Sequence, residues 1–106
     1  MVVQCLLESL DSKDKLPVRL DLDHVMIGRV AGDLSVPDPR CSPRHAMLYE
    51  TGGKIYVYDL GSREGTFLNE RRLEEAAQVR AGDRIRVAGW IVHVIGLTKE
   101  KARSVR

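Results

Sequence analysis

The chain has 106 residues, of which 43% are hydrophobic and 30% are charged, and its formal net charge is only +2. A chain of this length has room for one domain and buries somewhat over ~60% of its unfolded surface, so its core needs no metal or disulfide. The small net charge excludes a polycation that attracts nucleic acid through bulk charge alone.

Short segments rich in β-branched or aromatic residues predict strands along almost the whole chain, because Gly, Pro, Asp and Ser separate them. In chain order the predicted strands cover residues 2–8, 18–22, 25–28, 46–50, 55–59, 66–68, 84–87 and 90–97. Strands this short pack as a sandwich. Gly52 and Gly53 predict a two-residue hairpin turn before 55–59. In that strand the two tyrosines share one face, while Ile55 and Val57 share the other.

The N-terminus and the two cysteines give no indication of secretion, and no segment predicts a membrane helix. Cys5 and Cys41 do not form a close pair, and the N-terminus lacks the basic start, long apolar stretch and cleavage site of a secretory signal. The apolar stretch 88–97 is far shorter than the ~20 residues of a membrane helix. We therefore expect a soluble, cytoplasmic single domain over residues 1–98, followed by a flexible basic tail, 99–106.

Three motifs, in order along the chain, each supply a part of what phosphate capture needs. Ile27-Gly28-Arg29 puts the planar fork of an Arg at the end of a strand. Ser42-Pro43-Arg44-His45 puts a hydroxyl beside a second Arg. Residues 60–69, Leu-Gly-Ser-Arg-Glu-Gly-Thr-Phe-Leu-Asn, contain a Gly-bearing turn that brings backbone amides close to a ligand.

The order and spacing of these motifs resemble the forkhead-associated (FHA) domain, a module that reads phosphothreonine in partner proteins. The resemblance covers residues 25–96. It implies an all-β fold, an FHA-type β-sandwich of two twisted, mostly antiparallel sheets with the binding loops at one end. The resemblance also implies strand and loop for residues 70–79, although this segment contains helix-forming residues. It implies a turn at Ala81-Gly82-Asp83.

The resemblance implies roles for individual residues. Arg29 matches the family's main phosphate ligand, and Ser42 opens its Ser-x-x-His pattern. Arg44 is in a variable position and is either a second cation or a plain surface residue. The residues expected to bind phosphopeptide are Arg29, Ser42, Arg44, Arg63 and Glu64. The residues expected to support the binding loops are Gly28, His45, Gly65, Thr66 and Asn69.

Among the supporting residues, Gly28 is expected to leave space for another chain to approach its backbone. His45 is expected to hold the loops together through hydrogen bonds. Catalysis by a Ser42–His45 pair is not expected, because no third group and no nucleophile elbow accompany it. Asn69 is expected to brace the third loop.

Two residues depart from the family pattern. Pro43 offers neither a side-chain donor nor a backbone N–H. Glu64 stands where most relatives have Asn, and a carboxylate can only accept hydrogen bonds. At ~6 Å from a phosphate charge it would cost up to about 2 to 3 kcal/mol at an effective dielectric of ~20, unless Arg63 or Arg71 neutralises it.

The sequence therefore predicts a phosphothreonine-dependent signalling adaptor with no enzymatic activity, cofactor or metal. The expected partner is a phosphothreonine-containing protein, either a Ser/Thr kinase substrate or the kinase itself, and we expect a monomer that binds neither nucleic acid nor membrane. The alternative is a degenerate FHA domain that binds a protein, or itself, without phosphate. A nucleic-acid binder is disfavoured because aromatic residues for base stacking are scarce. Its phosphate contacts would be Arg40, Arg44, Arg63, Arg71 and Arg72.

Overall fold

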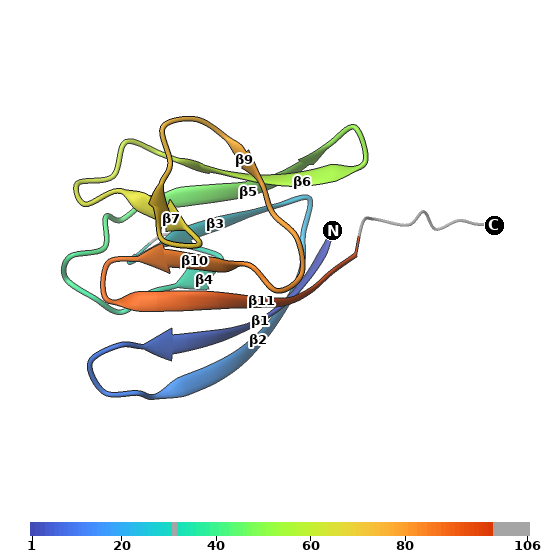
Figure 1. The fold of residues 1–106 in the computed structure, drawn as a ribbon. Helices are drawn as coiled ribbons and strands as arrows, with labels where there is room; N and C mark the ends of the chain where they lie inside the picture. The colour runs from blue at the N-terminus through green and yellow to red at the C-terminus, as the bar shows by residue number, and fades with distance from the viewer. Residues whose placement is uncertain (31, 99–106) are drawn as a thin grey trace.

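The chain folds as a sandwich of two β-sheets in a computed structural model that describes residues 1–30 and 32–98 (Figure 1). Its strands are β1 Val2–Ser9, β2 Lys15–Asp21, β3 His24–Gly28, β4 Leu34–Ser35, β5 Ala46–Thr51, β6 Lys54–Asp59, β7 Thr66–Leu68, β8 Arg71–Arg72, β9 Ala77–Gln78, β10 Arg84–Val87 and β11 Trp90–Thr98. One sheet has the order β2-β1-β11-β10-β7-β8 and the other β4-β3-β5-β6-β9. All neighbours are antiparallel except β3 and β4. The predicted all-β sandwich is confirmed.

The predicted strands agree with the structure best where the turns are sharp. The predictions 66–68 and 84–87 coincide with β7 and β10. The prediction 18–22 began too late, since β2 starts at Lys15 and contains Pro17. Because β2 is an edge strand, the missing N–H of Pro17 can face solvent. β4 was not predicted, because a two-residue strand has no periodicity to detect.

The core lies between the sheets, and β6 shows how the alternation builds it. Ile55 and Val57 are buried, while Tyr56 and Tyr58 on the outer face are half-buried, as the pattern predicted. The hairpin before β6 turns at Gly52 and Gly53, whose φ angles of 59° and 78° suit a two-residue turn between right-twisted strands. The core cluster includes Val3, Leu7, Val25, Ile27, Leu48, Val57, Ile85, Val87 and Val92.

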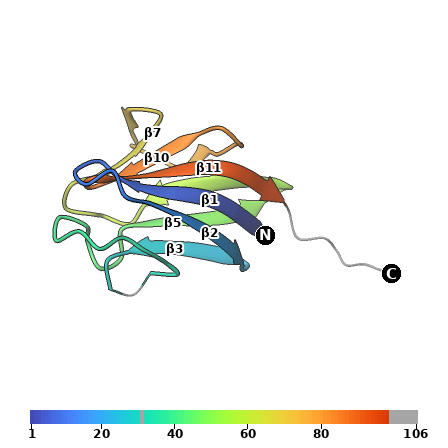
Figure 2. The same cartoon turned by 90° about the horizontal axis from the view of Figure 1, so that it is seen from below.

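The loops that carry the three motifs lie at one end of the sandwich. In Figure 1 the β3–β5 connection and the β6–β7 loop are at the left, and Met1 is at the opposite end. The same grouping holds in the view turned by 90° (Figure 2). The predicted tail, 99–106, lies outside the described residues.

Candidate functional site

The three motif loops meet at Ser42. The backbone N–H of Arg29 donates to the Ser42 carbonyl oxygen at 3.1 Å, which ties the loop after β3 to the loop before β5. The backbone N–H of Arg63, in the β6–β7 loop, donates to Ser42 Oγ at 3.0 Å. The chain therefore holds these loops together with its own hydrogen bonds.

Gly28 is at the closest of these approaches. A Cβ atom built there would lie 2.0 Å from the carbonyl oxygen of Pro43, a separation that no side chain tolerates. The sequence suggested that Gly28 leaves space for another chain. In the structure this chain's own Pro43–Arg44 segment occupies that space, because the β4–β5 loop folds over the end of β3.

His45 joins the second loop to the third from a fully buried position. Its Nδ1 accepts from the Ser42 backbone N–H at 3.1 Å, and its Nε2 lies 2.8 Å from the Gly65 carbonyl oxygen. An N–H group can only donate and a carbonyl can only accept, so the imidazole is neutral with its proton on Nε2. Both ring nitrogens are used for scaffolding.

Arg29 is exposed and fixed at one atom only. Its Nε donates to the Cys41 carbonyl oxygen at 3.0 Å. Its two terminal nitrogens form no hydrogen bond or ion pair with the residues that the structure describes. This arrangement orients the guanidinium and leaves four N–H donors for a ligand.

Ser42 and Arg44 also keep donors unused. Ser42 Oγ accepts one hydrogen bond, from Arg63, and within the described chain its own proton has no acceptor. The side chain of Arg44 is exposed and, within the same residues, forms no hydrogen bond or ion pair. The motif segment thus presents a hydroxyl and a cation to solvent.

Asp59, at the end of β6, organises the β6–β7 loop. Its carboxylate accepts four hydrogen bonds, from the backbone N–H groups of Gly61 and Ser62 and from the hydroxyls of Ser62 and Thr66. Burial raises the pKa of Asp59, but the Ser62 and Thr66 hydroxyls outweigh burial, so its pKa lies below the usual value. Sequence reasoning missed this residue, although Asp59-Leu60-Gly61-Ser62, with an Asp two residues before a Gly, is typical of an Asx turn.

The sequence predicted that the backbone amides of this loop face a ligand, but the structure shows them bonded within the protein. Gly65 N donates to Ser62 Oγ at 2.8 Å, and Arg63 N donates to Ser42 Oγ. Gly65 has a φ of 89°, and a Cβ there would lie 2.9 Å from the guanidinium carbon of Arg72. With the Gly61 and Ser62 amides on Asp59, the amides of Arg63 and Gly65 are therefore engaged inside the protein.

Asn69 braces the turn between β7 and β8. Asn69 and Glu70 have φ angles of 50° and 73°, as a two-residue hairpin turn requires. Asn69 Nδ2 donates to Asp83 at 3.0 Å, and Asn69 Oδ1 accepts from the Arg84 backbone N–H at 2.9 Å. Asn69 thus ties this hairpin to the turn before β10.

Glu64 is exposed beside the site and has no ion-pair partner among the described residues. Neither arginine that the sequence offered as a neutralising partner pairs with it. The Arg63 Nη2 atom donates instead to the Pro39 carbonyl oxygen at 3.2 Å. Among the described residues the Glu64 carboxylate therefore forms no ion pair, although it interacts electrostatically with Arg40.

Asp38 anchors the base of the β4–β5 loop, and sequence reasoning missed it as well. This buried carboxylate binds the Arg40 guanidinium at 2.8 and 3.0 Å and accepts from the Gly89 backbone N–H at 3.1 Å. The Arg40 hydrogen bond, opposed by burial and aided by the backbone donors of Arg40 and Gly89, lowers the pKa of Asp38 to about 2. The same bond is the main cause of the raised pKa of Arg40, to which Asp11 and Glu64 add less.

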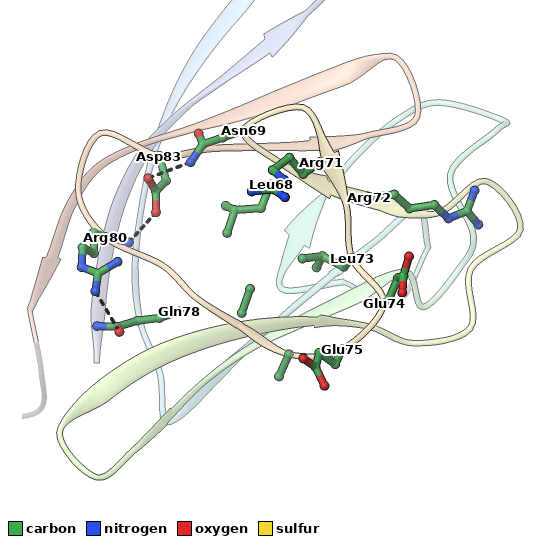
Figure 3. Close-up of a pocket in the computed structure, with 12 residues that line it drawn as sticks. Leu68, Asn69, Arg71, Arg72, Leu73, Glu74, Glu75, Gln78, Arg80 and Asp83 are labelled. Carbon is green, nitrogen blue, oxygen red and sulfur yellow. Dashed lines mark hydrogen bonds between the residues drawn. The ribbon is translucent and has the colours of Figure 1, made fainter.

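A hollow of about 600 Å³ lies away from these loops, where the chain passes from β8 to β9 (Figure 3). Charges of both signs line it, and Asp83 within it accepts hydrogen bonds from Asn69 and from the Arg80 backbone. The lining residues are Leu68, Asn69, Arg71, Arg72, Leu73, Glu74, Glu75, Ala76, Ala77, Gln78, Arg80 and Asp83. In Figure 3, Arg72 extends out of the hollow toward the β6–β7 loop.

The described residues offer little else for chemistry. They contain no group of three or more His, Cys, Asp or Glu side chains arranged to hold a metal ion. Cys5 and Cys41 are free and buried, and burial raises the pKa of each thiol to about 11. No helix in this part of the chain has the length and apolarity to span a membrane.

Comparisons with known proteins agree on one family. Residues 25–88 match the family model described as the FHA domain. The chain is 35% identical over 78 residues to the FHA domain-containing protein FhaB of Mycolicibacterium smegmatis, covering 73% of this chain and 50% of that protein. It thus spans about half the length of this relative.

Two solved structures extend the likeness to three dimensions. The FhaA FHA domain, complexed with the intracellular domain of a second protein, is 27% identical with a TM-score of 0.68, over 85% of this chain and 98% of that one. A structure from a study of phosphothreonine-dependent FHA domain interactions is 26% identical with a TM-score of 0.70, over 91% and 99% of the two chains.

Proposed function

Because this chain belongs to the FHA domain family, we propose that it is a phosphothreonine-dependent protein–protein interaction module. FHA domains are interaction modules rather than enzymes. The observation that carries the proposal is the state of Arg29. Its Nε is fixed on the Cys41 carbonyl and its backbone N–H on the Ser42 carbonyl, while its terminal nitrogens have no partner among the described residues.

The unused donors fit a phosphate group. A phosphothreonine carries a charge of about −2 and three acceptor oxygens. The terminal nitrogens of Arg29 take two oxygens through parallel charge-assisted hydrogen bonds, and the Ser42 hydroxyl donates to a third. Arg44 adds a second cation, while Arg63 and Glu64 face the peptide around the phosphate. None of these contacts requires a bond within the protein to break.

The scaffold residues support the proposal by fixing the loops before a ligand arrives. Gly28, His45, Gly65, Thr66 and Asn69 contact other parts of the protein, Thr66 through the Asp59 carboxylate, and do not need to touch the phosphate. In this role they lower the ordering cost of binding, because loop entropy has already been lost on folding.

The partner we propose is a phosphothreonine-containing protein, either a Ser/Thr kinase or its substrate. The similar FhaA FHA domain, in its complex with the intracellular domain of a second protein, supports a partner that is an intracellular protein segment. We propose residues 1–98 as one monomeric domain, acting in the cytoplasm without a cofactor.

A second candidate is a degenerate FHA domain that binds a protein, or a second copy of itself, without phosphate. The Glu64 carboxylate, which forms no ion pair in the described chain, favours this candidate, because its charge opposes a phosphate dianion nearby. Pro43 favours it as well, since it removes a donor from the second loop.

Titration of a phosphothreonine peptide library and of the unphosphorylated twins separates the two candidates. Arg29→Ala should weaken the phosphopeptide by roughly 30-fold to 150-fold, about 2 to 3 kcal/mol, with little change in melting temperature. Arg19→Ala, an exposed Arg on the edge strand β2, is the matched control and should bind like the wild type. Equal affinity in Arg29→Ala and wild type, or equal binding of both twins, would refute the phosphate role.

A further inference from the structure

Two arginines flank a phenylalanine on the outer face of the six-stranded sheet, and a third lies two residues from one of them along β10. In the register of this sheet Phe67 lies opposite Arg86 on one side and opposite Arg72 on the other. Arg84 is two residues from Arg86 along β10, so both side chains leave the same face. The residues that alternate with Phe67, Arg84 and Arg86 point into the sandwich. We call Arg72, Arg84 and Arg86 the arginine cluster.

The phenyl ring supports two of these cations. The guanidinium carbon of Arg86 lies 4.1 Å from the Phe67 ring centroid, and that of Arg72 lies 6.0 Å from it. A guanidinium over an aromatic face gains about 0.5 to 1 kcal/mol at an exposed site and keeps its N–H edges free. Only one of these edges is used among the described residues, by a long bond of 3.5 Å from Arg86 Nη1 to the Ala88 carbonyl.

No carboxylate neutralises the arginine cluster within the described chain. Glu8, on the same face two strands away, instead pairs with His93 at 2.7 Å, and this hydrogen bond lowers the pKa of Glu8. Asp83 precedes Arg84 but accepts from Asn69 and from the Arg80 backbone. Three like charges therefore share one small surface, and an anionic ligand there relieves their mutual repulsion.

The spacing of the cluster selects the shape of that ligand. Residues two apart on a strand are ~6.6 to 6.8 Å apart, which is the spacing of Arg84 and Arg86 along β10. Alternate side chains of any extended peptide repeat at the same distance. A peptide with acidic residues at every second position can therefore place successive carboxylates against successive arginines.

A single-stranded nucleic acid fits this face less well, although it is also anionic. Binding of that kind needs aromatic faces on which bases stack. The Phe67 ring is covered by Arg86, and the stacked tyrosines lie on the other sheet. We propose that the arginine cluster is a second docking site, which binds an extended acidic segment of a partner protein.

This docking site borders the β6–β7 loop, because Arg72 packs against Gly65, but it uses none of the groups assigned to the phosphate. A partner with both a phosphothreonine and an acidic segment would engage two surfaces of one domain. The acidic segment binds without phosphate, so the second site stands whether or not the first one reads phosphothreonine.

A ten-residue labelled peptide alternating Glu and Ser tests the proposal, with a Gln–Ser twin as the uncharged control. Fluorescence anisotropy gives the affinity, and amide chemical shifts locate the site. We expect shifts in β7, β8 and β10, and affinity that falls with added salt. The double variant Arg84→Glu with Arg86→Glu should bind at least about tenfold more weakly. Arg29→Ala should bind this peptide like the wild type.

The matched control is Lys15→Glu with Arg19→Glu, which makes the same change in net charge on the exposed edge strand β2. It should change the affinity less than about twofold. Arg84→Gln, at an exposed side chain, guards against misfolding of the double variant and should weaken binding severalfold. The proposal is overturned if the control loses as much affinity as the cluster variant, or if the shifts appear only around Arg29 and Ser42. It is also overturned if a ten-nucleotide single strand binds the same face more tightly than the peptide.

Discussion

Replacing His45 by alanine should destabilise the domain by removing the link between two loops. The imidazole is fully buried, accepts from the Ser42 N–H at 3.1 Å and donates to the Gly65 carbonyl, 2.8 Å away. Truncation leaves both backbone groups without a partner, at about 1 to 3 kcal/mol each. We expect the free energy of unfolding to fall by about 2 to 5 kcal/mol, a large part of the roughly 5 to 15 kcal/mol of a small domain.

Urea unfolding followed by tryptophan fluorescence measures this loss, because Trp90 is the single tryptophan and packs against the core. His24→Ala is the matched control. His24 is exposed on the outer face of β3, so this change should alter the free energy by less than about 0.5 kcal/mol.

Two further variants test the assigned tautomer. His45→Asn places an amide oxygen near the former Nδ1 and keeps an acceptor for Ser42, whereas His45→Gln places an amide nitrogen near Nε2 and keeps a donor for Gly65. Each should recover about one hydrogen bond, or 1 to 2 kcal/mol, relative to His45→Ala. The reasoning is refuted if His45→Ala is as silent as His24→Ala, or if neither amide recovers any stability.

Three other outcomes follow from the same geometry. Gly28→Ala forces the Pro43 carbonyl away from a Cβ that would sit 2.0 Å from it, so thermal melts should show a loss of about 1 to 3 kcal/mol, with weaker phosphopeptide binding. The folded pKa of Asp38, about 2, lies below its ordinary value of 3.8, so its contribution is complete above about pH 5 and is lost as the pH falls toward 2. Because Arg40 is 48% exposed, we expect the ionised Asp38 to contribute only about 1 to 2 kcal/mol to the free energy of unfolding. The stability of Asp38→Asn should therefore fall less between pH 5 and pH 2 than that of the wild type. Glu64→Asn should raise phosphopeptide affinity, more at low salt, and unchanged affinity in a salt series would show that its carboxylate does not act on the phosphate.

The strands could be predicted where burial alternates along a segment and turn residues bound it. Residues 84–87 satisfy both conditions, since Ile85 and Val87 are buried and two-residue turn chemistry follows at Ala88 and Gly89. The start of β2 failed the first condition, because this edge strand is exposed on both faces from Lys15 to Pro17 and becomes half-buried only at Val18 and Leu20. Alternation is a signal of burial, so it weakens at the edges of a sheet.

The motif residues of the site remain sequence-based predictions, and of the two carboxylates that support their loops only Asp59 had a signal in the sequence. Asp38 accepts from the Gly89 N–H, 51 positions along the chain, and only the folded sandwich brings these groups together. Asp59 acts within its own loop, and its Asx turn to the Gly61 N–H is a local pattern that the sequence could have indicated. A local hydrogen-bond pattern is readable from sequence, whereas a partner on another strand is not.

The hydrogen bonds that fix the loops are separate from the donors that we assign to the ligand. The polar atoms of His45 and Asp59 form hydrogen bonds with backbone and hydroxyl groups. In the described chain the terminal nitrogens of Arg29 and the hydroxyl proton of Ser42 form none. Loop ordering therefore belongs to folding and adds little to the cost of binding. With that cost removed, affinity at this site depends chiefly on charge. The single exposed carboxylate of Glu64 can then determine whether the domain binds phosphothreonine, even though every hydrogen bond of the scaffold is intact.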